Sequence, residues 1–320
     1  MIKSEFKLIE SIKEKLDKTQ GLSDTITGIG DDCAVYKISN ERYGIFSTDI
    51  SIEGRHFNLK YTSLFNAGYR AMAANISDIY AMGGKPILAL TTIGVPKKFT
   101  QEMISELYDG IATCAVKYKT YIAGGDTSIS DSLIINISIY GESSNPIYRS
   151  GANGGDKIYM TGNTGLSMLG LKALQKNYNI TNFRKSIGKH LKPEPRGDII
   201  NYILEKYEPT AMIDISDGLL SDLGHICEMS KCGFELHLKR IPVDNEIKNF
   251  CDHKKINTLD YTLYSGEEFE LIFTSPKEII GDSNITYIGD IIPYGYEAVS
   301  DNEKRLITTE GFDHFKQLKR

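Results

Sequence analysis

The most informative hydrophobic pattern in the chain lies at residues 66–86. Small residues recur there three, four and seven positions apart, which predicts a helix; they are Ala67, Ala71, Ala74 and Ala81. A second apolar stripe predicts that this helix is buried on nearly every side; it consists of Tyr69, Met72, Ile76 and Ile79. Gly83 and Gly84 end the helix, and Pro86 prevents it from continuing.

The remaining hydrophobic segments predict further helices and strands in mixed order. A helix is expected over residues 2–20, with inward-facing Phe6, Ile9, Ile12 and Leu16. Another is expected over 102–118, with inward-facing Leu107, Ile111 and Val116. Apolar runs predict strands at 43–48, 86–95, 120–123, 133–141, 157–161 and 211–214.

A glycine-rich polar segment at residues 149–156 is the best candidate for a domain junction. A chain of 320 residues has room for one large domain or two of ordinary size. We therefore expect an N-terminal domain over 1–148 and a C-terminal domain over 149–320.

Composition and charge narrow the class of protein. With 41% hydrophobic and 25% charged residues, the chain has the composition of a globular protein. A net charge of −5 argues against nucleic-acid binding. We expect no signal peptide and no membrane span, because no apolar run is long enough. Five cysteines without a C-x-x-C motif favour reduced thiols and a cytoplasmic location, and no histidine has the spacing of a zinc site.

Aspartates recur at predicted strand ends, at glycine turns and on the buried helix. They are Asp31, Asp32, Asp49, Asp78, Asp126, Asp214 and Asp217. Taken singly, each has a simpler explanation: a local turn, a helix cap at Asp217, or a pairing of Asp78 with Arg70. Hydroxyl groups accompany several of them, at Ser47, Thr48, Thr127 and Ser216.

If several of these acids converge, their repulsion requires cations. Two carboxylates 4 Å apart repel by about 1 kcal/mol in water and about 4 kcal/mol at an effective dielectric constant of 20. Ligands that are all oxygen favour Mg²⁺ or Mn²⁺ over zinc. The chain contains neither a P-loop nor a dinucleotide-binding glycine motif. The pattern therefore indicates a nucleoside triphosphate held mainly through its metal ions.

Eight motifs, in order, resemble those of the thiamine-phosphate kinase family. That family belongs to the superfamily of aminoimidazole ribonucleotide synthetase and selenophosphate synthetase. The motifs are GIGDDCAV (28–35), STDISIEGRHF (47–57), NISDIYAMGGKP (75–86), GGDT (124–127), RSGANGGD (149–156), DISDGLLSDLG (214–224), SGEEFEL (265–271) and GFDHF (311–315). The resemblance implies a two-domain α/β fold, with an N-terminal mixed sheet that dimerises through its strands and a sandwich-like C-terminal domain.

The resemblance also implies an activity and a set of site residues. The family transfers the γ-phosphate of ATP to thiamine monophosphate. The Mg²⁺ ligands implied here are Asp32, Ser47, Thr48, Asp49, Asp78, Asp126, Asp214 and Asp217; among them Asp32, Asp49, Asp78, Asp126 and Asp214 are implied to be catalytic. The implied ATP contacts are Tyr108, Gly125, Asp126, Arg149 and Ser216. The implied thiamine contacts are His56, Glu267 and Phe312.

Two departures from the family pattern and two alternative functions stand beside this interpretation. Where the family usually has Gly-Gly-Glu-Asp-Tyr, this chain has Ser-Gly-Glu-Glu-Phe at 265–269, and Ser51 replaces an apolar residue.

A sister ATP-dependent synthetase is one alternative function. Selenophosphate synthesis, however, needs a reactive cysteine unlike Cys33, which follows the acids in a strand. A non-catalytic nucleotide-binding module is the other. The stiff loop at 192–196, with Lys192 and Arg196, either lies over phosphates or simply leads into a helix.

Overall fold

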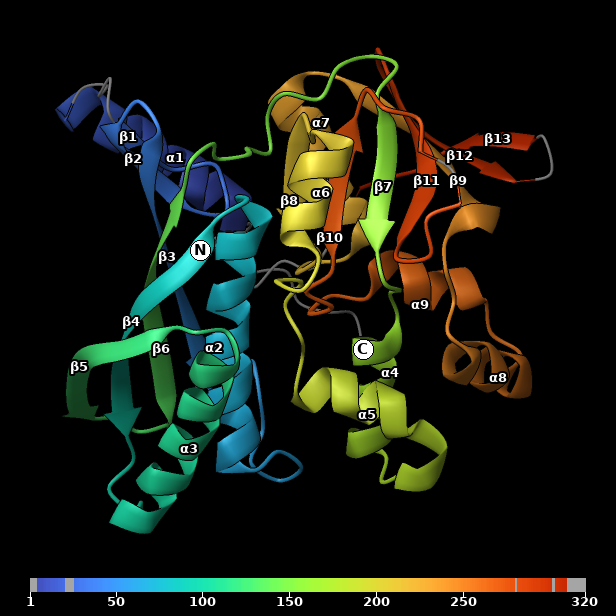
Figure 1. Ribbon diagram of the computed structural model, residues 1–320. Helices are drawn as coiled ribbons and strands as arrows, with labels where there is room; N and C mark the ends of the chain where they lie inside the picture. Colours follow the sequence, from blue (N-terminus) through green and yellow to red (C-terminus); the bar gives the residue numbers. More distant parts are fainter. Residues whose placement is uncertain (1–4, 21–25, 280, 301–302, 310–320) are drawn as a thin grey trace.

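The computed structural model describes residues 5–20, 26–279, 281–300 and 303–309. Within them the chain forms two mixed sheets that stand side by side, each accompanied by helices (Figure 1). Helix α1 (Glu5–Gln20) precedes the first sheet. The mixed α/β fold expected from the sequence is confirmed.

The first sheet has six strands among the described residues, in the order β1-β2-β3-β6-β4-β5. Only β4 and β5 pair in parallel; the other neighbours are antiparallel. Helices α2 (Leu64–Ala81) and α3 (Gln101–Lys117) cover one face. The strands are β1 (Ile26–Thr27), β2 (Ala34–Ser39), β3 (Arg42–Ile52), β4 (Lys85–Val95), β5 (Tyr121–Ile129) and β6 (Ile134–Ser143).

The second sheet has seven strands in the described part of the chain, in the order β13-β12-β9-β11-β7-β10-β8. Its strands are β7 (Lys157–Thr161), β8 (Ala211–Asp214), β9 (Gly233–His237), β10 (Leu271–Ser275), β11 (Ile285–Ile292), β12 (Tyr296–Ser300) and β13 (Glu303–Leu306). Its helices are α4 (Leu166–Gln175), α5 (Arg184–Leu191), α6 (Ile200–Tyr207), α7 (Leu219–Ser230), α8 (Asn245–Lys254) and α9 (Thr258–Tyr264).

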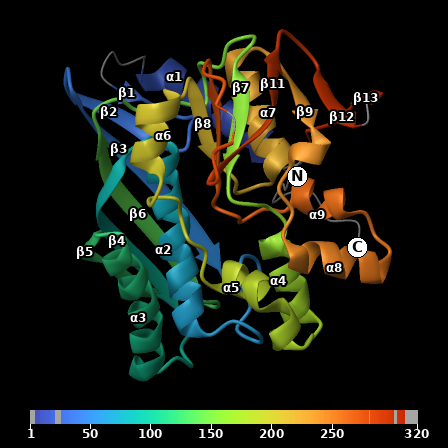
Figure 2. The same ribbon diagram turned by 45° about the vertical axis from the view of Figure 1, so that its right-hand side comes forward.

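Helix α2 lies between the two halves and contacts both (Figures 1 and 2). The Ser63 side chain caps its first turn by accepting a hydrogen bond from the Asn66 amide. On one side α3 approaches so closely that a Cβ on Gly110 would lie 1.9 Å from the Phe65 carbonyl oxygen. On the other side the core continues into the second sheet through Tyr159 and Phe273. The prediction of a helix buried nearly all round is confirmed.

The face of the first sheet away from α2 and α3 is exposed and carries several large apolar side chains. Side chains alternate along β3 and β4, so that inward residues such as Ile45 are buried while their neighbours face outward. Phe46, Ile50 and Leu90 are 47%, 49% and 45% exposed, and Tyr121 on β5 is 74% exposed. Several large apolar side chains exposed on one face of a sheet are typical of an interface.

Several predictions about individual elements were wrong. Ile9 and Ile12 are 39% and 43% exposed and Val116 is 76% exposed, because helical periodicity identifies an apolar stripe but not what covers it. Strands β3 and β5 continue past Asp49 and Asp126, so these acids lie within strands rather than at their ends. The domain boundary after residue 148 remains a prediction. In the described part of the chain, no helix combines the length and apolarity needed to cross a bilayer.

Candidate active site

Three aspartates from distant parts of the chain meet between the two halves. Asp32 precedes β2, Asp78 lies on α2 and Asp214 ends β8. Each offers a carboxylate oxygen, and these oxygens lie within 4.8 Å of one another. We call these three residues the acid cluster.

Neighbouring hydroxyl groups orient two members of the acid cluster. Ser47 donates a hydrogen bond to Oδ2 of Asp78, and Ser77 Oγ donates to Oδ2 of Asp214 at 2.5 Å. Beside them, the backbone amide of Asp49 donates to Asn75 Oδ1 at 3.2 Å. Ser47 on β3 therefore fixes the Asp78 carboxylate on α2, and Ser77 on α2 fixes the Asp214 carboxylate at the end of β8.

Burial and mutual repulsion disfavour the charged forms of these acids. Burial raises the pKa of Asp214 to about 8 and that of Asp49 to about 6, and in both cases the nearby Asp32 carboxylate adds to the effect. Burial, followed by Asp49 and Asp214, raises the pKa of Asp78 well above its usual range. Such a group of carboxylates is stable in its charged form only when cations bind to it.

Arg149 supplies one positive charge to the acid cluster. Its Nη2 lies 2.5 Å from Oδ1 of Asp32. The other oxygen of Asp32 is buried and has no hydrogen-bond partner among the described residues. A single guanidinium therefore does not satisfy three buried carboxylates. The all-oxygen donor set, with an unsatisfied buried oxygen, fits a hard divalent cation such as Mg²⁺.

Asp31 has a different environment from Asp32. Its carboxylate accepts hydrogen bonds from the backbone amides of Arg149, at 3.1 Å, and of Asp32, at 3.1 Å. Burial raises its pKa to about 7, and the neighbouring Asp32 adds to this shift. Asp31 therefore anchors the segment that carries Arg149 instead of joining the acid cluster.

The loop that follows β8 is held by Asp222, which the sequence reasoning missed. Its Oδ2 accepts hydrogen bonds from the backbone amides of Ser216, Asp217 and Gly218 at 3.0–3.1 Å. The carboxylates of Asp217 and Asp222 and the ring of His225 lie close together, in a group separate from the acid cluster. The sequence signal for Asp222 was its position five residues after Asp217, in the first turn of a predicted helix. An acid at such a position can accept hydrogen bonds from the backbone amides that precede the helix.

Glu267 lies beside this loop on a strained segment. Its backbone amide donates to the Ser216 carbonyl at 2.8 Å. Glu267 and Phe269 both have positive φ angles, 56° and 51°, which non-glycine residues adopt at a cost of about 1–3 kcal/mol each. Strain of this kind is typical of functional segments, because the surrounding structure must hold it in place.

Three side chains surround the Glu267 carboxylate. Arg70 Nη2 lies 2.7 Å from its Oε2, and His190 Nδ1 lies 3.9 Å away. Burial opposes ionisation, but Arg70, His190 and then His56 lower the pKa of Glu267 below its usual value. His56 also accepts a hydrogen bond from the Ile52 amide at 3.0 Å, which fixes its ring. The predicted thiamine contacts His56 and Glu267 therefore lie in the same electrostatic environment.

The alternative pairing of Asp78 with Arg70 is wrong, because Arg70 turns to Glu267. Arg70, Asn75 and Ser77 were missed as site residues, although Asn75 and Ser77 stand within the same four-residue motif as Asp78. They project from α2 at helical spacing, and only the packed helix reveals which elements they meet. Phe312 lies outside the described residues.

Four other predicted site residues do not reach the acid cluster. The Thr48 hydroxyl faces the opposite side of the sheet and lies 3.0 Å from Ser138 Oγ, so the structure gives no support for Thr48 as a side-chain ligand. Asp126 shares that outer face, since its partner on β4 is the exposed Thr92. Three strand-to-strand steps separate β5 from β3, or about 14 Å.

Gly125 and Tyr108 lie near this edge of the first sheet. A Cβ on Gly125 would lie 1.8 Å from the Thr91 carbonyl oxygen, so glycine allows the close pairing of β5 with β4 there. Tyr108 helps to line a cavity of about 550 Å³ with Thr127 and Ser128. The predicted ATP contacts thus fall into two groups: Arg149 and Ser216 near the acids, and Tyr108, Gly125 and Asp126 apart from them.

Comparisons with known proteins match both halves of the chain. Residues 30–143 match the N-terminal domain of AIR synthase related proteins, and residues 153–279 match the C-terminal domain. The thiamine-monophosphate kinase of Buchnera aphidicola subsp. Schizaphis graminum is 39% identical over 98% of this chain and 99% of its own length. The chain belongs to the thiamine-monophosphate kinase family.

Solved structures of the thiamine-monophosphate kinase family agree with this fold. AaThiL complexed with AMPPCP and TMP is 31% identical, with a TM-score of 0.88 over 98% of this chain and 97% of that one. Thiamine monophosphate kinase from Aquifex aeolicus is 30% identical, with a TM-score of 0.81 over 92% of this chain and 97% of that one. The family expected from the eight motifs is confirmed, and with it the two-part AIR synthase-related fold.

Proposed function

We propose that this protein transfers the γ-phosphoryl group of ATP to thiamine monophosphate, with several Mg²⁺ ions, and so forms thiamine diphosphate. The observation that carries the proposal is the acid cluster of Asp32, Asp78 and Asp214, assembled from both halves of the chain, with Glu267 held by Arg70 of the same helix that carries Asp78. The family membership supports a kinase, and the relative solved with AMPPCP and TMP supports this pair of ligands.

The residues proposed to hold Mg²⁺ are those with oxygen donors in and beside the acid cluster. Asp32, Asp78 and Asp214 would provide carboxylates, with Asp49 and the Ser47 hydroxyl next to them. Mg²⁺ bound there would neutralise the charge of the phosphates that approach each other. Arg149 is placed beside Asp32, where its guanidinium would contact a phosphate oxygen.

No general base is needed for this transfer. The acceptor is a phosphate oxygen of thiamine monophosphate that is already ionised near neutral pH, so positioning and charge neutralisation make up the catalysis. Glu267, whose pKa is lowered below its usual range, would be ionised and would attract the cationic thiazolium ring of the acceptor. His56 and Phe312 are the other proposed thiamine contacts, and Asp217 remains a proposed metal ligand.

The remaining ATP contacts are proposed to work in a homodimer. The outer face of the first sheet, with Phe46, Ile50 and Leu90, offers an apolar surface for a second copy of the chain. Pairing through this face would place Asp126 and Thr48 at the dimer interface. There both residues would lie next to the second chain, whereas in a single chain they only face outward from the sheet. Tyr108 and Gly125 would then contribute to the nucleotide site from this edge of the sheet.

We also propose that the protein acts in the cytoplasm as a two-domain enzyme divided after residue 148. All five cysteines are free thiols, and Cys33, Cys114, Cys227 and Cys251 are buried. A reducing compartment would keep them so. The segment with Arg149, which joins the two sheets, then belongs to the second domain. Its guanidinium pairs with Asp32 of the first domain, so the site uses residues from both domains.

The decisive experiment follows two products in parallel. Purified protein is incubated with ATP and Mg²⁺, with and without thiamine monophosphate, while ADP and thiamine diphosphate are measured. We expect equal amounts of both, formed only with the acceptor. ADP release with some other acceptor and no thiamine diphosphate would point to a sister synthetase. ATP binding without any acceptor-dependent turnover would point to a non-catalytic module.

A further inference from the structure

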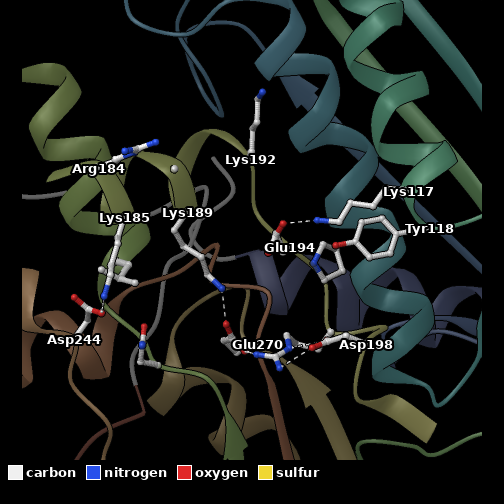
Figure 3. Close-up of a pocket in the computed structure, with 15 residues that line it drawn as sticks. Lys117, Tyr118, Arg184, Lys185, Lys189, Lys192, Glu194, Asp198, Asp244 and Glu270 are labelled. Carbon is white, nitrogen blue, oxygen red and sulfur yellow. Dashed lines mark hydrogen bonds and ion pairs between the residues drawn. The ribbon is translucent and has the colours of Figure 1, made fainter. Parts of the chain in front are cut away.

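A polar cavity of about 860 Å³ lies apart from the acid cluster. It opens between the C-terminal end of α3, helix α5 and the loop at 192–198 (Figure 3). None of the residues that line it belongs to the acid cluster, and Lys192 and Arg196 come from the stiff loop for which the sequence left a phosphate contact open. Its size is within the range of cavities that hold small organic ligands, roughly 300–1,000 Å³.

Positive charge predominates in this cavity. Four carboxylates line it, at Glu194, Asp198, Asp244 and Glu270. Six cations line it: Lys117, Arg184, Lys185, Lys189, Lys192 and Arg196. The local excess is two positive charges, in a chain whose net charge is −5. A local excess of positive charge in a protein whose net charge is negative attracts anions to that part of the surface.

The local sequence explains why the cations face one way. Lys185 and Lys189 are four residues apart on α5, so they project from one side of that helix, and Lys192 follows directly after its end. Pro193 and Pro195 then stiffen the loop that brings Arg196 to the same cavity. The Lys192 ammonium lies 4.6 Å from the centre of the Phe65 ring, which holds it at the rim.

The cavity already binds one anionic group, which belongs to the protein itself. Oε1 of Glu270 lies 2.5 Å from Lys189 Nζ, and its Oε2 lies 3.0 Å from Arg196 Nη1. Glu270 is only 4% exposed, and Thr161 Oγ1 donates to it at 2.7 Å. The floor of the cavity is thus a preformed arrangement of two cations around a carboxylate, while Arg184 and Lys192 lie above it.

We propose that this cavity binds a phosphate-bearing small organic molecule at a site separate from the acid cluster. Arg184 and Lys192 would contact the phosphate groups at the rim, and Lys189 and Arg196 would attract them from below. Tyr118, Leu166 and Pro195 provide an apolar wall for the organic part. Because His190 follows Lys189 and contacts Glu267, an occupant would act next to the residues that orient Glu267.

The test uses the full-length protein in EDTA, so that no divalent cation is present to hold a phosphate at the acid cluster. ADP and inorganic pyrophosphate are the probes, titrated by calorimetry at low ionic strength. We expect a dissociation constant for ADP below about 1 mM that rises steeply with salt. The double variant Arg184→Gln with Lys192→Gln should weaken binding about tenfold. Neither Arg184 nor Lys192 forms an ion pair with another described residue, so the double substitution leaves no carboxylate unpaired there and the fold is expected to persist.

Two further variants keep the result decisive. Lys176→Gln with Lys248→Gln removes the same charge from exposed positions outside the cavity and should leave the affinity unchanged. Asp198→Asn removes an exposed carboxylate beside Arg196 and should strengthen binding about threefold, since Arg196 loses a competing partner. An absence of ADP binding by the wild-type protein, or equal binding by the two double variants, would overturn the proposal.

Discussion

Arg70 Nη2 lies 2.7 Å from Glu267 Oε2, and this contact joins the central helix to the strained segment before β10. Arg70 and Asp78 are on the same helix, eight residues or about 12 Å apart. One rigid element therefore positions both a member of the acid cluster and the carboxylate proposed to contact thiamine. A displacement of α2 would disturb both at once.

Loss of the Arg70 contact should affect substrate binding more than turnover. In Arg70→Gln, Glu267 loses its nearest cation, so its pKa rises and its orientation is no longer fixed. We expect KM for thiamine monophosphate to rise about tenfold or more, with a smaller change in kcat. Arg42→Gln, which breaks the exposed pair with Glu142, is the matched control and should change neither. A fall in kcat at constant KM would contradict this role.

Asp78→Asn should abolish most activity without unfolding the protein. The substitution removes one of three clustered carboxylates, so metal-assisted transfer should fall by a factor of about 100 or more. In EDTA the variant should unfold at no lower urea concentration than the wild type, because the lost charge is one that burial and neighbouring acids disfavour. Product formation and urea titration, with and without Mg²⁺, test both statements. A fully active variant would remove Asp78 from the mechanism.

Glu268 should make stability depend on pH. Its Oε1 accepts hydrogen bonds from the Gly165 and Ser167 amides and from Ser265 Oγ, at 2.5–3.0 Å, while its buried Oε2 has no partner in the described structure. Burial raises its pKa to about 7 from 4.5. The folded state therefore holds this proton more tightly than the unfolded state, and stability falls as pH rises from about 4.5 to about 7.

The variant Glu268→Gln isolates that contribution, because glutamine does not titrate. Relative to the variant, the wild type should lose on the order of 3 kcal/mol of unfolding free energy between pH 4.5 and pH 8. Urea titrations of both proteins across this range supply the measurement. A constant difference between them would mean that Glu268 titrates normally.

The exposed face of the first sheet should hold two copies together. Ile50→Lys puts a charge at the centre of this face, where Ile50 is now 49% exposed, and should convert a dimer into monomers. Val116→Lys alters an even more exposed apolar residue, on α3 instead of the sheet, and should leave the assembly intact. Sedimentation velocity distinguishes the two masses. A wild-type protein that sediments as a monomer would reject the dimer.

The sequence alone determined the elements whose own pattern is unambiguous. The helix around Asp78, the strand Lys157–Thr161 and the turn after Asp214 all follow from local periodicity and glycine placement, and the structure has them. The family followed from eight motifs in order. The proposal that acids converge also came from the sequence, since a recurring charge on apolar elements needs a common explanation.

Only the tertiary structure decided which of those acids meet. Strand alternation places Asp49 on the inner face of the first sheet and Asp126 on the outer face, but a one-residue change of register would reverse this, and register depends on pairing with distant strands. Helix α2 likewise fixes its partners by packing: Asp78 meets Ser47, Ser77 meets Asp214, and Arg70 meets Glu267. Local patterns show that a side chain is costly to bury, whereas only long-range packing determines which group compensates it.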